Sequence, residues 1–323
     1  MLGRQVPRPF LKWAGGKTQL LDELVRRVPK RFETYYEPFL GSGALFFHLY
    51  RLGMIKRAVL SDINKELIAT YVAIRDSVQD VIDILSTFPY DRDHFYHLRS
   101  MDPDKLDFPM VAARMIYLNK TGYNGLYRVN RRGQFNVPFG SQCGKPKIVD
   151  RENLIAVSRA LHSVEILCAD FGDILARAVS NDFVYCDPPY VPISRTSSFT
   201  QYQPGGFTES DQIRLRVMCE FLSSNGVSVM ISNSSADSVL SRFRPHGFRC
   251  EFVNARRFIN SVGSKRGVVL ESILTNYSIR LSEVHQNETF EDSLCVPSVR
   301  PAGGMAQDDF SYVDIVGVAG EGP

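Results

Sequence analysis

Short apolar runs alternate with longer segments of helical periodicity through residues 1–281 of the chain. The runs have the length of buried strands, and several of them end in an acidic residue. The longer segments repeat leucine, isoleucine and valine at intervals of three and four residues, as the buried face of a helix does. Strands that alternate with helices predict an α/β fold, with a largely parallel sheet and helices on both of its faces.

The expected elements follow from these patterns and from the Gly, Pro and Asn residues that separate them. Strands are expected at the start of 34–43 and over 57–62, 164–169, 182–186, 227–232, 248–253 and 268–277. Helices are expected over 20–25, 44–52, 64–85, 112–120, 151–161, 208–223 and 236–243. The stretch 88–109 mixes Pro, Asp and aromatic residues and predicts no regular element.

Charge is distributed unevenly along the chain. From Ser282 onward, eight acidic residues accompany only Arg300, which gives this part a net charge of −7 and leaves residues 1–281 basic. Gly, Pro and Ser replace the helical and strand patterns there, so residues 282–323 are expected to form a disordered acidic tail. A basic folded body suggests a polyanionic partner.

The composition excludes several classes of protein. Runs of about 18 apolar residues are missing and no signal peptide opens the chain, so we expect a cytoplasmic protein without a membrane segment. The six cysteines form no CxxC pair. We therefore expect neither a disulfide framework nor a metal site.

A strand, a glycine-rich turn and a helix follow one another at 34–52. Gly41 and Gly43 in this turn, just after Phe39, allow the backbone to pass close to a ligand. The next strand ends in Asp62, which can accept hydrogen bonds from both hydroxyls of a ribose. The full GxGxxG pattern is missing, so the segment favours a mononucleoside such as S-adenosylmethionine over a dinucleotide.

The strand expected over 182–186 ends abruptly at Asp187, Pro188, Pro189 and Tyr190. Proline fixes the backbone φ angle, so the chain leaves the sheet through a stiff corner. The carboxyl ends of strands are where open α/β sheets bind their ligands. A carboxylate, the Pro188 carbonyl and an aromatic ring around one small volume suit a planar base with an exocyclic amine. A strand followed by a simple Pro-Pro turn is the alternative.

The segment 109–149 contains seven basic residues and no acidic residue. Within 121–140, bases, aromatic rings, amides and glycines alternate, which predicts a loop and a short hairpin. Arginine and asparagine recognise base edges and phosphates, and an aromatic ring stacks or wedges between bases. The pattern predicts an inserted domain that recognises DNA. A hairpin with a solvated basic face would have the same pattern.

Asp170 follows the strand expected over 164–169, and Phe171 comes next. The Asp170 carboxylate could accept a hydrogen bond from the adenine amine of a nucleoside cofactor, with the Phe171 backbone N–H as a donor beside it. A cap for the following helix explains Asp170 equally well. The sequence leaves both interpretations open.

Together these stretches resemble the Dam-type, D12-class family of DNA adenine-N6 methyltransferases. The resemblance runs in the family's order from about Phe10 to Tyr277. It is carried by the motifs FLKWAGGK, EPFLGSG, LSDIN, TGYNGLYRVNRRGQFNVPFG, ADF, DPPY, SFT and RRFINS. The chain departs from the family pattern at Ser141 and Gln142, where the family has a base and an aromatic residue. The acidic tail lies outside the resemblance.

The resemblance implies roles for the residues that match these motifs. The pocket for S-adenosylmethionine would contain Trp13, Lys17, Glu37, Phe39, Gly41, Gly43, Asp62, Asp170, Phe171 and Asp187. The target adenine would be received by Asp187, Pro188, Pro189 and Tyr190. Duplex DNA would be contacted by Lys12, Tyr123, Asn124, Leu126, Arg128, Asn130, Arg132 and Pro138. Direct methyl transfer would need neither a metal nor a cysteine nucleophile.

The prediction is a Rossmann-like methyltransferase sheet formed by 1–75 and 151–281, with a mostly helical recognition domain and β-hairpin at 76–150. The enzyme would methylate N6 of a flipped-out adenine in duplex DNA, in GATC or a related site. It would act as a monomer that dimerises weakly on DNA, in the cytoplasm of a bacterium or of a phage-infected host. The alternatives are a cytosine-N4 or RNA adenine methyltransferase, a catalytically silent DNA-binding protein and, least favoured, a nicotinamide-dependent oxidoreductase.

Overall fold

The computed structural model describes residues 5–13, 15–130, 132–140, 146–190, 206–256 and 268–278. Residues Met1–Leu281 group into one compact unit. Several sequence predictions lie outside the described residues: the acidic tail over 282–323, the SFT motif, all but the first residue of RRFINS, and the departures at Ser141 and Gln142.

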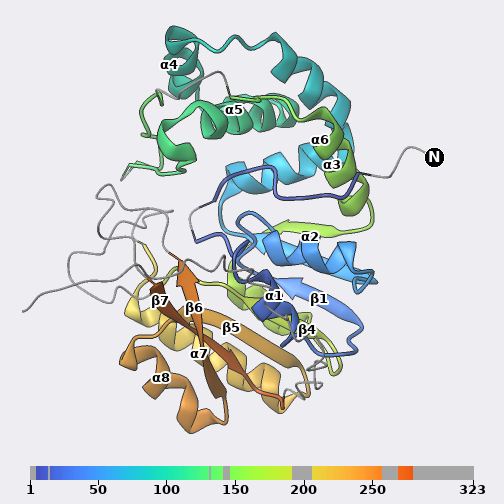
Figure 1. Cartoon of the computed structure of the whole chain (residues 1–323), viewed down its shortest axis with the longest axis vertical. Helices are drawn as coiled ribbons and strands as arrows, with labels where there is room; N and C mark the ends of the chain where they lie inside the picture. The colour runs from blue at the N-terminus through green and yellow to red at the C-terminus, as the bar shows by residue number, and fades with distance from the viewer. Residues whose placement is uncertain are drawn as a thin grey trace, which may run out of the picture. The chain divides into compact units, whose positions relative to one another are not determined.

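Within the described residues, seven strands form one sheet in the order β3-β2-β1-β4-β5-β7-β6 (Figure 1). The strands are β1 Thr34–Glu37, β2 Arg57–Asp62, β3 Glu165–Cys168, β4 Phe183–Cys186, β5 Ser228–Ser234, β6 Arg249–Arg256 and β7 Val268–Thr275. Strands β1 to β5 pair in parallel, whereas β7 is antiparallel to both β5 and β6. The predicted Rossmann-like sheet is confirmed.

Helices cover both faces of this sheet, as predicted. They are α1 Leu21–Val25, α2 Ala44–Arg51, α3 Lys65–Thr87, α4 Arg92–Ser100, α5 Phe108–Thr121, α6 Arg151–Leu161, α7 Glu209–Ser224 and α8 Asp237–Phe243. Tyr35 and Tyr36 are neighbours in β1, yet they belong to different buried cores because successive strand residues point to opposite faces. The Tyr35 core includes residues of α1 to α6, and the Tyr36 core includes residues of α7 and α8.

The stretch 88–109 is more regular than its sequence predicts. It contains α4, a short 3-10 helix at Pro103–Lys105 and the start of α5. Asp91 caps α4 by accepting a hydrogen bond from the His94 N–H at 2.8 Å. Asp107 caps α5 in the same way, and Pro109 lies in the first turn, where its missing N–H costs nothing. The expectation that α5 begins at 112 was therefore wrong, because Pro109 opens this helix instead of blocking it.

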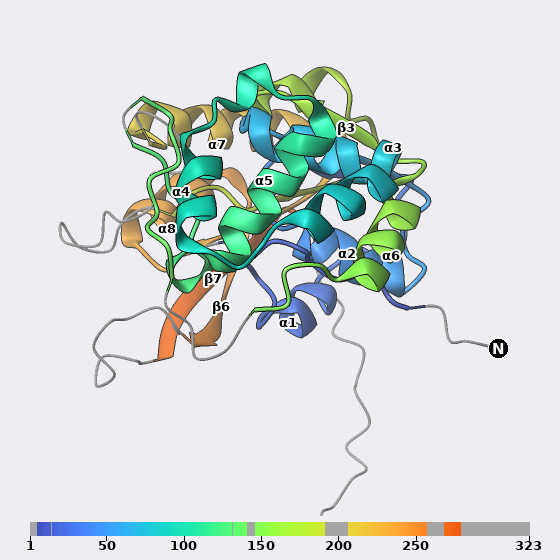
Figure 2. The ribbon, with the colours of Figure 1, turned by 90° about the horizontal axis from the view of Figure 1, so that it is seen from above.

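Helices α3, α4 and α5 pack together beyond one edge of the sheet (Figures 1 and 2). The segment after α5 forms the expected short hairpin, in which Val129 pairs with Phe135 and the Asn130 N–H donates to the Gln134 carbonyl at 2.8 Å. Tyr127, Val129, Phe135 and Val137 are buried, whereas the described residues between them are exposed or half-buried. This alternation fixes which side chains of the hairpin face outward.

Among the described residues, none of the helices combines the length and the apolar character that a membrane span requires.

Candidate active site

Three strands bring acidic residues to one edge of the sheet. Glu37 ends β1, Asp62 ends β2 and Asp187 follows β4. Because β1 lies between β2 and β4 and is parallel to both, the carboxyl ends of all three strands meet at the same edge. The structure thus brings together three of the four acids that the sequence analysis assigned to the cofactor and to the adenine.

The glycine turn after β1 forms a close contact with the segment that contains Trp13. A Cβ atom on Gly41 would lie 2.8 Å from Trp13 Cδ1, so the indole rests directly on the backbone of the turn. The Gly41 N–H donates to Asp62 Oδ2 at 3.1 Å, and the Tyr71 hydroxyl donates to the Gly41 carbonyl at 3.1 Å. Gly43 follows as the residue before α2. Trp13, Asp62 and Tyr71 therefore all contact the turn at Gly41.

Asp62 is fixed by backbone donors. In addition to Gly41, the Asn64 N–H donates to Asp62 Oδ1 at 3.0 Å. Burial raises the pKa of Asp62, and these backbone N–H groups lower it. A carboxylate oxygen can accept more than one hydrogen bond. Asp62 can therefore still accept hydroxyl donors from a ligand.

Glu37 is the most deeply buried acid of the site, with a residue exposure of 3%. The Tyr35 hydroxyl donates to Glu37 Oε2 at 2.9 Å. Burial raises the pKa of Glu37 to about 8, and the hydrogen bond from Tyr35 opposes this rise. Glu37 is thus largely protonated at neutral pH unless a cation binds beside it.

Asp187 lies in a dense polar cluster. Its Oδ1 atom lies 2.7 Å from the Lys17 ammonium and accepts a hydrogen bond from the Ser232 hydroxyl at 2.9 Å. The Lys17 ammonium also lies 4.5 Å from the centre of the Tyr190 ring. Burial raises the pKa of Asp187, while the charge of Lys17 and the Ser232 hydroxyl lower it. Two donors on one oxygen hold this carboxylate in a fixed orientation.

Three residues of this cluster were missed in the sequence. Ser232 lies on β5, where Ile231 pairs with Cys186, so it sits beside the residue that follows β4. The Tyr185 hydroxyl lies 2.9 Å from the Ser232 hydroxyl, and the Tyr190 hydroxyl donates to Glu271 on β7. The position of Ser232 at the carboxyl end of a neighbouring parallel strand was the one usable signal.

Asp170 caps a short 3-10 helix, Phe171–Ala176, by accepting from the Gly172 N–H at 2.9 Å. The same oxygen also pairs with Arg214 at 2.6 Å. The capping interpretation is therefore observed, and the adenine contact stays a prediction. Phe171 packs against Phe39 with ring centres 5.3 Å apart, and the Arg214 guanidinium lies 4.7 Å from the centre of the Phe171 ring.

Three of the predicted DNA-contacting residues line one cavity of about 580 Å³: Lys12, Tyr123 and Asn124. Lys120 and Lys147 line the same cavity, although the sequence had not singled them out as site residues. Half of the Tyr123 surface is exposed. Asn124 adopts a positive φ of 55°, a conformation that asparagine tolerates better than most residues.

The other predicted DNA-contacting residues lie along the hairpin. Arg128, Arg132 and Pro138 are exposed, and Leu126 is half-buried. Asn130 is already engaged: its Oδ1 accepts the backbone N–H groups of Arg132 and Gln134 and so shapes the turn. A contact between Asn130 and DNA stays a prediction, with its amide constrained by the turn.

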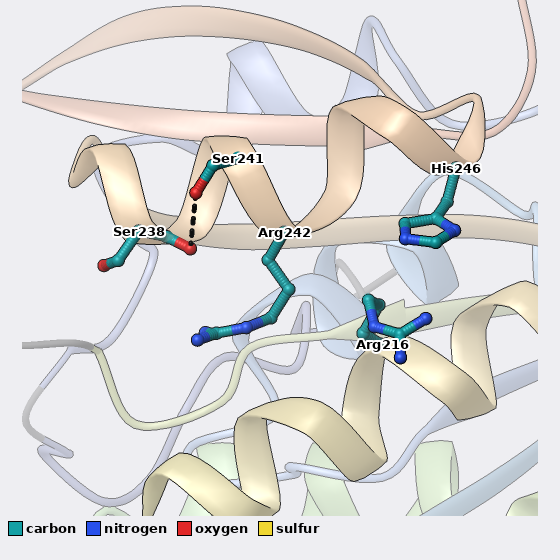
Figure 3. Close-up of a pocket in the computed structure, with 5 residues that line it drawn as sticks. All are labelled: Arg216, Ser238, Ser241, Arg242 and His246. Carbon is teal, nitrogen blue, oxygen red and sulfur yellow. Dashed lines mark hydrogen bonds between the residues drawn. The ribbon is translucent and has the colours of Figure 1, made fainter.

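A second cavity of about 380 Å³ lies between α7 and α8, and none of the predicted site residues lines it (Figure 3). It is lined by Arg216, Ser238, Ser241, Arg242 and His246. Arg242 is paired with Glu209, and Arg216 and His246 are both paired with Glu220. Each arginine of this cavity is therefore paired with a carboxylate within the protein.

No group of three or more side chains suited to holding a metal ion occurs in the part of the chain that the structure describes.

Comparison with known proteins places these features in a family. Residues 13–253 match the model of the D12 class N6 adenine-specific DNA methyltransferases. The type II methyltransferase M1.LlaDCHI of Lactococcus lactis subsp. cremoris is 40% identical over 278 residues, which cover 84% of this chain and 95% of that protein. The type II methyltransferase M.MjaIII of Methanocaldococcus jannaschii is 39% identical over 288 residues, which cover 84% and 99%.

The DNA adenine methylase of Escherichia coli is 37% identical over 268 residues, which cover 82% of this chain and 93% of that protein. The match to the family model spans the described site from Trp13 through Asp187 to Ser232. The chain therefore belongs to the D12 class of N6-adenine-specific DNA methyltransferases, enzymes that methylate DNA with S-adenosylmethionine as the methyl donor.

Proposed function

We propose that the protein methylates N6 of an adenine that has swung out of duplex DNA into the pocket beside Asp187 and Tyr190. The observation that carries this proposal is the oriented Asp187 carboxylate. Lys17 and Ser232 both occupy Oδ1, and neither of these contacts uses Oδ2. The two donors on Oδ1 fix the orientation of the carboxylate. Its other oxygen, Oδ2, is then suited to accept one hydrogen of an exocyclic amine.

The Pro188 carbonyl would accept the second hydrogen of N6, and the Tyr190 ring would stack on the base. Two acceptors draw the nitrogen lone pair out of conjugation with the ring and direct it away from the plane of the base. Asp187 must be ionised for this role, and the Lys17 charge favours that state against burial. These residues act mainly by positioning and by electrostatics.

The residues around the glycine turn fit S-adenosylmethionine. This cofactor supplies an intrinsically electrophilic methyl group. Gly41 lacks the Cβ atom that would collide with Trp13, so the indole can pack directly on the turn beside the proposed cofactor site. Asp62 would accept from the ribose hydroxyls, and Glu37 would pair with a cationic group of the cofactor. Asp170 and Phe171 would contact its adenine.

We assign the cavity beside Lys12 and Tyr123 and the outer face of the hairpin to DNA. Tyr123 is a half-exposed aromatic ring at the start of a short turn, suited to fill the gap that a flipped base leaves. Flipping costs a few kcal/mol, and stacking and edge contacts in the pocket offset this cost. The target is GATC or a related site, an assignment that depends on the resemblance of the hairpin motif.

The proposed division assigns residues 1–75 and 151–281 to cofactor binding and catalysis, and 76–150 to DNA recognition. The protein would work as a monomer that dimerises weakly on DNA, in the cytoplasm where its DNA substrate lies. Membership of a family specific for N6 of adenine in DNA argues against cytosine N4 and against RNA as the target.

The decisive variant is Asp187→Asn, which keeps the shape of the side chain but places an amide donor where an acceptor is required. We expect methyl transfer to duplex DNA to fall by at least about a hundredfold. Asp173→Asn, on an exposed acid of the nearby 3-10 helix, is the matched control and should retain activity. Digestion of the product to nucleosides identifies the methylated base, and modification-sensitive sequencing identifies its site. Full activity in Asp187→Asn would overturn the proposal.

A further inference from the structure

Trp13 and Tyr127 join two segments that are far apart in the sequence. We define the cofactor-side segment as residues 10–13 and 15–17, and the recognition segment as residues 119–130 and 132–140. The rings of Trp13 and Tyr127 are stacked, with centres 4.7 Å apart and an interplanar angle of 22°. The same indole rests on Gly41 in the glycine turn. Tyr127 therefore supports the ring that borders the proposed cofactor pocket.

Tyr127 is itself fixed by burial and by a hydrogen bond to α3. Its residue exposure is 6%, and its hydroxyl donates to Glu66 Oε2 at 3.4 Å. Glu66 lies in the first turn of α3 and pairs with the buried Arg114 of α5. The Arg114 Nε atom donates to the Leu98 carbonyl at 2.8 Å. The ring that supports Trp13 is thus fixed by α3, α4 and α5.

Asn119 makes a second connection between the same two segments. Its Oδ1 accepts the Lys12 N–H at 2.8 Å, and its Nδ2 donates to the carbonyls of Lys12 at 2.8 Å and of Gly125 at 3.1 Å. The residue exposure of Asn119 is 2%. Buried hydrogen bonds of this kind are costly to break, because the freed groups have no water to replace their partners. The Asn119 amide thus bonds the backbone of Lys12 in one segment and of Gly125 in the other.

We propose that Tyr127 and Asn119 are positioning residues that fasten the cofactor-side segment to the recognition segment. Neither side chain contacts Asp187 among the interactions of the described residues. The two residues act through Trp13 and Lys12, which the proposed function assigns to the cofactor and to DNA. The proposal rests on that function. It predicts that a change within the recognition segment impairs binding of S-adenosylmethionine.

The first test compares Tyr127→Leu with Tyr127→Phe. Leucine removes the stacked ring, whereas phenylalanine keeps the ring and loses only the hydroxyl. The free energy that an aromatic pair of this geometry contributes corresponds to a change of about two- to tenfold in affinity. We expect Tyr127→Leu to raise KM for S-adenosylmethionine by that factor, with a smaller effect on KM for DNA. Tyr127→Phe should retain most of the wild-type value.

Trp13 offers a readout that needs no turnover, because it is the only tryptophan of the chain. Loss of the stack should expose the indole and shift its emission to longer wavelength in Tyr127→Leu but not in Tyr127→Phe. Tyr127→Met, which has a longer and more flexible side chain than leucine and also has no ring, serves as a second variant if Tyr127→Leu does not fold. A wild-type emission spectrum in the folded ring-free variant would overturn the proposal.

The second test uses two asparagines with similar environments. Asn153 is also 2% exposed. Its Oδ1 accepts the Arg8 N–H at 3.0 Å, and its Nδ2 donates to the Arg8 carbonyl at 3.0 Å. Asn119→Asp and Asn153→Asp each replace a buried donor with an acceptor, so both should lower stability. Only Asn119→Asp should raise KM for both substrates, because only Asn119 links the recognition segment to Lys12 of the cofactor-side segment.

Equal KM values in the folded Asn119→Asp and Asn153→Asp variants would show that Asn119 acts only on stability, and would overturn its part of the proposal. A wild-type chain that methylates no DNA would instead overturn the proposed function. The emission of Trp13 separates these cases, because it reports on the stack without methyl transfer.

Discussion

The Lys17 ammonium lies 2.7 Å from Asp187 Oδ1, although these residues are 170 positions apart in the chain. The side chain of Lys17 is 5% exposed and that of Asp187 is 20% exposed, so water screens this pair only weakly. Burial is the main cause of the raised pKa of Asp187, and the charge of Lys17 opposes it. Lys17 thus favours the ionised carboxylate that amine recognition requires.

Replacement of Lys17 should therefore change the pH dependence of methylation. Burial already raises the pKa of Asp187, and activity is lost as pH falls through that pKa because a protonated carboxyl cannot accept the amine hydrogen. Lys17→Met removes the charge that lowers the pKa, so the acidic limb of kcat/KM should move to higher pH. At neutral pH we expect a loss of about tenfold or more. Rates measured across the pH range provide the test.

The control for this variant is Lys56→Met. Lys56 is a mostly exposed lysine that lies 3.9 Å from Glu33. Its removal should leave the pH profile unchanged, because exposed ion pairs contribute little. Superimposable acidic limbs in Lys17→Met and the wild-type protein would mean that Lys17 does not influence the ionisation of Asp187.

Glu37 should make the ligand-free protein less stable as pH rises. Burial raises the pKa of Glu37 from 4.5 to about 8. Between these values the unfolded chain releases the proton while the folded chain keeps it, so the free energy of unfolding falls with increasing pH. The slope contributed by Glu37 approaches about 1.4 kcal/mol per pH unit at most. Glu37→Gln should remove this contribution.

Denaturant unfolding at several pH values between 5 and about 8.5 measures this contribution. The stability difference between Glu37→Gln and the wild-type protein should shift in favour of the variant as pH rises. Glu33→Gln is a control on an exposed glutamate of the same segment and should run parallel to the wild-type curve. A parallel curve for Glu37→Gln as well would show that Glu37 ionises normally in the folded protein.

Gly41 and Gly53 form a matched pair for the contact with Trp13. Both have a positive φ, 48° and 69°, where a side chain is strained by about 1 to 2 kcal/mol. A Cβ on Gly41 would also lie 2.8 Å from Trp13 Cδ1, whereas a Cβ on Gly53 would meet nothing within 4 Å. Gly41→Ala should therefore raise KM for S-adenosylmethionine by about tenfold or more, because the indole must move. Gly53→Ala should lose only stability.

Thermal unfolding and steady-state kinetics on the two alanine variants separate strain from collision. Similar losses of stability with an effect on KM only in Gly41→Ala would support a cofactor site at the turn. An unchanged KM in Gly41→Ala would place the cofactor elsewhere.

The positions of two of the acids of the site were predictable because the end of a strand is a local feature of the sequence. Asp62 and Asp187 each come at or directly after the end of an apolar run, whereas Glu37 was assigned from the family resemblance. Parallel strands then bring all three to one edge of the sheet. The hairpin was predictable for a similar reason, because its alternating pattern lies within a short segment. Helix α4 was missed because its buried side chains, Phe95 and Leu98, are too few to produce a clear period.

The rest of the site depends on pairings that no local pattern encodes. Glu271 reaches Tyr190 because β7 enters the sheet antiparallel beside β5, and the sequence gives strand lengths but not this order. The stack of Trp13 on Tyr127 likewise joins a residue that precedes α3 in the chain to one that follows α5. Such contacts arise from tertiary packing, which a reading of periodicity cannot supply.

Tyr123 should matter for methylation and not for stability. Half of its surface is exposed, and it lines the cavity that contains Lys12 and Asn124. Tyr123→Ala should change the free energy of unfolding by less than about 0.5 kcal/mol, as other exposed substitutions do. It should lower methylation of an adenine in a perfect duplex by about tenfold or more, because no ring then fills the gap left by the flipped base. Phe221→Ala, on an equally exposed ring of α7, should affect neither property.

A duplex with a mismatch opposite the target adenine sharpens this test. A mismatched base costs less to flip, so the deficit of Tyr123→Ala should shrink on that substrate if the ring acts by stabilising the gap. A deficit of equal size on both duplexes would mean that Tyr123 contributes only to general DNA affinity. Its part in base flipping would then have to be assigned to another residue that lines the cavity, such as Asn124.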